Sequence, residues 1–70
     1  MNADEHGRLL TLASEYVQVV EMMRSGQYDG DEEYNTLSSQ RTITHDELIQ
    51  LTGITERSAM YAHCRELLRR

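Results

Sequence analysis

The chain has 70 residues, of which 39% are hydrophobic and 27% charged, ordinary values for one small globular domain. Twelve acidic residues stand against seven arginines and no lysine, so the net charge is −5 and most of the surface repels nucleic acid. So small a core hardly walls a substrate pocket, and the sequence lacks the clustered cysteines and histidines of a zinc site. We therefore expect no enzyme, no cofactor and no metal.

The sequence also bears on location. Its acidic start does not resemble a secretory signal, and no apolar run reaches the roughly 18 residues of a membrane helix. The single cysteine, Cys64, cannot form an internal disulfide, which suits a reducing compartment. We expect a cytoplasmic protein that does not engage a membrane.

Residues 3–25 are predicted to form one long helix. Asn2 followed by Glu5 resembles a capping box, and Gly26 suits the end of a helix. The apolar residues cover an arc of about 180°, wider than the roughly 100° that packing on one core requires. We predict that part of this arc faces a second copy in a homodimer; packing within one chain is the alternative. The predicted dimer contacts are Leu9, Leu12, Tyr16, Val19, Val20 and Met23.

Residues 27–43 read as an acidic connector that holds a short helix over 31–37. Asp31 suits the cap of that helix, and Ser38 and Ser39 suit its end. The acidic side chains imitate the start of a calcium loop, but Tyr34 stands where the loop needs glycine. The connector is therefore predicted to be solvated.

Residues 44–69 are predicted to form a short helix, a turn and a last helix. Thr44 with Glu47 forms a second capping-box pattern, and Thr55 suits the cap of a helix that runs from residue 56 to about 69. Together with 3–25, these elements predict a single all-α domain over 1–70.

In this last part of the chain a turn glycine, an apolar residue and a capping threonine follow one another at Gly53, Ile54 and Thr55. The pattern resembles the helix-turn-helix and winged-helix regulators, without the β-wing. The glycine allows a positive φ in the turn, and small residues allow two helices to cross closely. The resemblance implies buried side chains at Leu48, Ile54, Ala59 and Ala62.

The resemblance further implies that helix 56–69 enters the major groove of DNA. The side chains it would use are Arg57, Ser58, Tyr61 and Arg65. Glu56, Met60 and Cys64 make the same surface acidic or apolar, and the acidic first half of the chain lies nearby. A dimeric, sequence-specific DNA-binding repressor is therefore the alternative and not the leading hypothesis.

The leading hypothesis is a small non-enzymatic regulator that binds another protein and modulates or inhibits it. Methionine and tyrosine are enriched at protein interfaces, and an acidic rim suits a basic partner such as a transcription factor or a nucleic-acid-handling machine. As a small, acidic, lysine-free chain with a helix-turn-helix remnant, it resembles small accessory proteins of phages and mobile elements. Met60 and Tyr61 have packing on the long helix as their alternative role. The predicted protein-binding residues are Tyr28, Asp31, Glu32, Glu33, Tyr34, Met60 and Tyr61.

Overall fold

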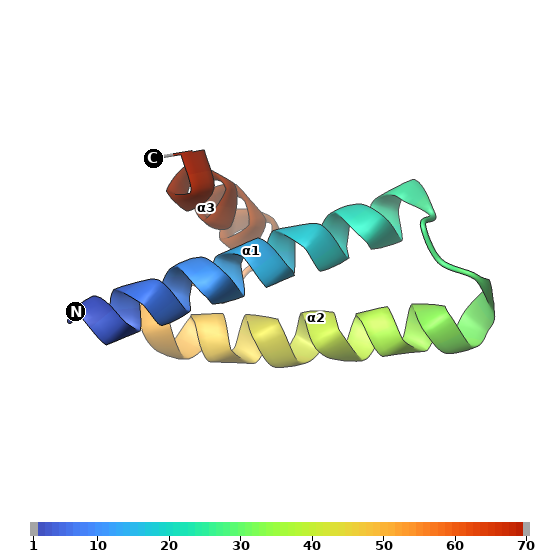
Figure 1. Ribbon diagram of the computed structural model, residues 1–70, viewed down its shortest axis with the longest axis horizontal. Coiled ribbons are helices and arrows are strands. Elements are labelled where there is room, and N and C mark those ends of the chain that lie inside the picture. The colour runs from blue at the N-terminus through green and yellow to red at the C-terminus, as the bar shows by residue number, and fades with distance from the viewer. Residues whose placement is uncertain (1, 70) are drawn as a thin grey trace.

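The chain folds into three helices: α1 (Ala3–Ser25), α2 (Gly30–Thr52) and α3 (Arg57–Arg69). The structure, a computed structural model, describes residues 2–69. Helices α1 and α2 lie side by side and run in opposite directions (Figure 1), and α3 crosses α1 and contacts it at Tyr16, Glu21 and Arg24. The predicted all-α class is confirmed.

The predicted bounds of α1 are confirmed together with both of its caps. The backbone N–H of Glu5 donates a hydrogen bond of 2.9 Å to the side-chain oxygen of Asn2. At the other end Gly26 takes the left-handed conformation, with φ 71°. Local capping chemistry therefore sets where this helix begins and ends.

The prediction for residues 27–43 is wrong, because α2 is one continuous helix. Only Gly26 to Asp29 separate α1 from α2, and the N–H of Asp29 donates to the carboxylate of Glu33 at 2.7 Å. Neither a break at the serines nor a cap at residue 44 occurs: Thr44 lies buried inside α2 and donates to the carbonyl of Gln40 at 2.6 Å.

Packing against α1 explains this continuity. The buried residues of α2 are Leu37, Thr44 and Leu48, whose spacing of seven and four places them on one face. Polar residues such as serine disfavour a helix interior by only about 0.5 kcal/mol each. Burial of two leucines, at roughly 1.5–3 kcal/mol each, outweighs that preference.

The wide apolar arc of α1 packs against α2 and α3 of the same chain. The prediction that part of this arc faces a second copy is corrected accordingly. Helices α2 and α3 pack on different sides of α1, so the arc faces two partners. Of the six predicted dimer residues only Met23 is half-buried, and the other five are buried: Leu9, Leu12, Tyr16, Val19 and Val20.

The turn between α2 and α3 depends on Gly53. Its φ is 77°, which agrees with the positive φ predicted for this glycine. Its N–H donates to the carbonyl of Ile49 at 2.8 Å. Helix α3 starts at Arg57, one residue later than predicted, and its first backbone bond runs from Met60 to the carbonyl of Glu56 at 2.9 Å.

Two glycine substitutions should have opposite effects on stability. Gly53→Ala forces a side chain into the left-handed region, which should lower the free energy of unfolding by about 1–2 kcal/mol. Gly7→Ala is the control: it lies inside α1, an added Cβ there meets nothing within 4 Å, and alanine should raise the free energy of unfolding by up to about 1 kcal/mol. Urea denaturation followed by circular dichroism measures both. Equal losses in the two variants would contradict this account.

Candidate functional site

Helix α3 presents the reverse of the face that the helix-turn-helix resemblance implied. Met60 and Cys64 are fully buried in the core, whereas Ala59 and Ala62 are exposed. The expected burial of Leu48 is confirmed, and Ile54 is half-buried. The close helix crossing that small residues permit is therefore not formed through Ala59 and Ala62, and the packing alternative holds for Met60.

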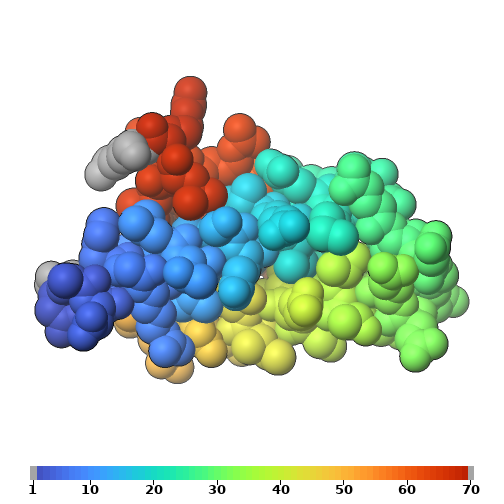
Figure 2. All heavy atoms as spheres, in the orientation of Figure 1, coloured from blue at the N-terminus to red at the C-terminus, as the bar shows by residue number. Residues whose placement is uncertain are grey.

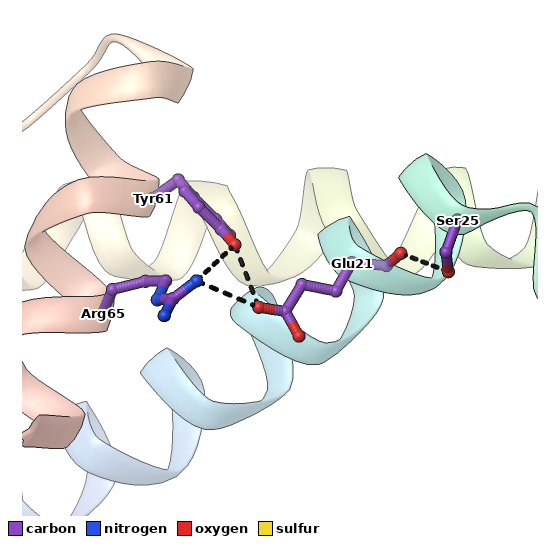
Figure 3. A network of polar contacts seen from close by, with 4 residues as sticks. All are labelled: Glu21, Ser25, Tyr61 and Arg65. Carbon is purple, nitrogen blue, oxygen red and sulfur yellow. Dashed lines mark hydrogen bonds and ion pairs between the residues drawn. The ribbon is translucent and has the colours of Figure 1, made fainter.

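The predicted DNA-binding residues fall into two groups. Arg57 and Ser58 are exposed at the start of α3. Tyr61 and Arg65 instead contact α1 through Glu21 (Figure 3). The four side chains therefore do not form one free basic stripe on α3.

The contact with Glu21 joins α3 to α1. The Tyr61 hydroxyl donates to Glu21 Oε1 at 3.0 Å, and Arg65 Nη1 donates to the same oxygen at 3.4 Å and to the Tyr61 hydroxyl at 3.2 Å (Figure 3). The Arg24 guanidinium lies 4.7 Å from the centre of the Tyr61 ring, within range of a cation–π interaction. Because these groups are largely exposed, they orient Tyr61 more than they stabilise the fold.

The predicted protein-binding residues are also divided between places. Tyr28 and Tyr34 pack together at the start of α2, with ring centres 5.1 Å apart. The three carboxylates between them, Asp31, Glu32 and Glu33, occupy the exposed first turn of α2, where negative charge stabilises a helix. Buried Met60 cannot belong to this surface, which corrects the prediction, and Tyr61 is half-buried on α3.

An open groove lies between α1 and α2, and it was not predicted from the sequence. This cavity, which we call the α1–α2 groove, has a volume of about 480 Å³. Its most prominent side chain is Ile43, with 61% of its surface exposed. The groove is lined by Glu15, Gln18, Val19 and Met22 from α1 and by Leu37, Gln40, Ile43 and Thr44 from α2.

An ion pair bridges the two helices beside the groove. Arg8 donates to Glu47 Oε2 at 3.0 Å. Arg8 lies seven residues before Glu15 on α1, and Glu47 lies four residues after Ile43 on α2. These spacings place Arg8 and Glu47 on the same helix faces as the residues that line the groove. The hairpin formed by α1 and α2 extends beyond α3 toward the connection between these two helices, as Figure 2 shows.

Comparison with known proteins identifies no relative: no family model, no curated protein and no solved structure matches this chain.

Among residues 2–69, no group of three His, Cys, Asp or Glu side chains could hold a metal ion. None of the helices in the described part of the chain is long and apolar enough to cross a membrane.

Cys64 is buried, and this burial raises the pKa of its thiol from 9.0 to about 11. The thiol is therefore protonated and packed in the core near neutral pH.

Stability should fall at alkaline pH because of this thiol. An unfolded chain loses the Cys64 proton near pH 9, whereas the folded chain keeps it to about pH 11. The free energy of unfolding is therefore unaffected below about pH 9 and falls above it, by roughly 1 kcal/mol at pH 10. Urea denaturation at several pH values measures the slope. Cys64→Ala should have a shallower slope between pH 9 and pH 10, and an unchanged slope would contradict the assignment.

Proposed function

We propose that this chain is a small non-enzymatic regulator that binds a basic amphipathic helix of another protein in the α1–α2 groove. The observation that carries the proposal is the exposure of Ile43 beside the half-buried side chain of Met22, in a groove whose floor includes the buried side chains of Val19 and Leu37. Burying an isoleucine side chain contributes about 1.5–3 kcal/mol, so this position favours a partner that covers it.

The shape of the groove suits a helix. Helices α1 and α2 lie side by side, and a further helix laid along their seam packs as in a helical bundle. Leu37 and Ile43 are six residues apart on α2, which corresponds to about 9 Å along the axis. A partner helix spans that distance with apolar side chains at positions i, i+4 and i+7.

Charge favours a basic partner. Among its lining residues the groove has one carboxylate, Glu15, and no cation, and the whole chain carries −5. Lysine or arginine at the edges of the partner's apolar stripe therefore increases the rate of association and the selectivity. Gln18 and Gln40 offer amide groups to the same polar edges.

A pair of designed peptides tests this proposal. One is helical with leucine at i, i+4 and i+7 and lysine elsewhere on its edges, and the other replaces lysine by glutamate. Fluorescence anisotropy should show the lysine peptide binding at least about tenfold more tightly. Ile43→Asn should weaken that binding by about tenfold, because the buried side chain is lost.

The matched control is Leu68→Asn, which alters another exposed apolar residue, on α3. It should leave peptide binding unchanged. Equal weakening by both variants, or equal binding of both peptides, would count against the groove. Sedimentation gives a separate check, since a dimer that Ile43→Asn converts to monomer would make a second copy the occupant instead.

The DNA-binding repressor stays as a second candidate because Arg57 and Ser58 are exposed at the start of α3. We expect no gel shift of duplex DNA at low salt and micromolar protein, since α3 also presents Ala59, Ala62 and Glu66 to solvent. A shift that Arg57→Ala abolishes and Arg69→Ala does not would favour the repressor.

A further inference from the structure

A second cavity, separate from the α1–α2 groove, lies where the three helices meet. Its volume is about 370 Å³, and each helix contributes one arginine to its lining: Arg24 from α1, Arg41 from α2 and Arg57 from α3. We call it the arginine pocket. Its other lining residues are Tyr16, Val20, Met23, Tyr34, Ser58 and Tyr61, so it contains no carboxylate.

The three pocket arginines differ from the other described arginines in having no ion-pair partner among the described residues. In the described part, Arg8, Arg65 and Arg69 each form an ion pair with a glutamate, and no such pair is formed by the three pocket arginines. The three arginines lack a carboxylate partner although the chain has 12 acidic residues. Three like charges around one cavity repel one another, and a bound anion relieves that repulsion.

Arg41 gives a second, independent sign of a missing partner. Its side chain is half-buried, and its Nε is fully buried with no hydrogen-bond partner among the described residues. A buried donor without an acceptor costs about 1–3 kcal/mol, and native proteins leave few such groups unexplained. Arg41 therefore has neither an ion-pair partner nor an acceptor for this nitrogen among the described residues.

Tyr16 lines the pocket together with the three arginines. Its hydroxyl donates to the carbonyl of Arg57 at 3.5 Å, and its ring lines the pocket. Burial, and to a lesser extent Cys64, raises the pKa of Tyr16, while the charges of Arg41, Arg57 and Arg24 all act in the opposite direction. Each of the three charges therefore favours the ionised form of the Tyr16 hydroxyl.

We propose that the arginine pocket binds a phosphate monoester. Such a group carries a charge of about −1.5 to −2 and three acceptor oxygens, which three guanidinium groups match better than they match a single carboxylate. Ser58 in the first turn of the 13-residue helix α3 adds a hydroxyl donor and a favourable helix end. The volume beside Val20 and Met23 leaves room for a compact apolar group on the ester.

Phenyl phosphate is the probe that tests the proposal, with inorganic phosphate beside it. Both should raise the melting temperature relative to chloride at equal ionic strength, and calorimetry should give a Kd for phenyl phosphate. Arg41→Gln and Arg57→Gln should each raise that Kd by at least about tenfold, because each removes a charge-assisted bond. The controls Arg8→Gln and Arg69→Gln remove arginines outside the pocket and should leave it unchanged.

Several outcomes would overturn the proposal. They are the absence of any effect beyond chloride, equal losses in the pocket and control variants, equally tight binding of benzoate, and binding of duplex DNA without binding of phenyl phosphate. Circular dichroism and urea denaturation confirm that each variant is folded. Because the α1–α2 groove is a different surface, the peptide experiment and this one succeed or fail separately.

Discussion

The fold depends on α1 serving as the central helix, with apolar contacts on two sides. Tyr16, Leu48, Met60 and Cys64 come from all three helices and are the largest fully buried side chains. A helix with an apolar arc of about 180° needs either two partners in its own chain or one outside it. Here α2 and α3 are the two partners within the chain. The α1–α2 groove and the arginine pocket lie where these two helices cover α1 incompletely.

Local signals predicted α1 and the glycine turn, because both depend on residues close in sequence. Asn2, Gly26 and Gly53 act through caps and a positive φ that the chain makes within a few residues. The continuity of α2 could not be predicted in this way. Thr44 resembles a helix start by its own chemistry, and only burial against α1 places it inside a helix.

The rotation of α3 about its axis was likewise beyond local reasoning. Both a Met60–Cys64 face and an Ala59–Ala62 face are compatible with a helix over these residues, and the family resemblance favoured the second. The structure buries the first, since the larger side chains gain more from leaving water. The candidate surfaces were missed for the same reason: Ile43 and Arg41 lie in the stretch that was predicted as a connector.

Neighbouring residues of the hairpin divide between the two cavities. Val19 and Gln40 line the groove, whereas the next residue in each case, Val20 and Arg41, lines the arginine pocket. Consecutive residues of a helix point about 100° apart, so one pair of helices presents an uncharged to acidic surface on one side and a cationic one on the other. A chain of net charge −5 can therefore keep a strongly positive site without spreading positive charge over its surface. This separation places the proposed peptide-binding surface and the proposed phosphate-binding pocket on different faces of the same two helices.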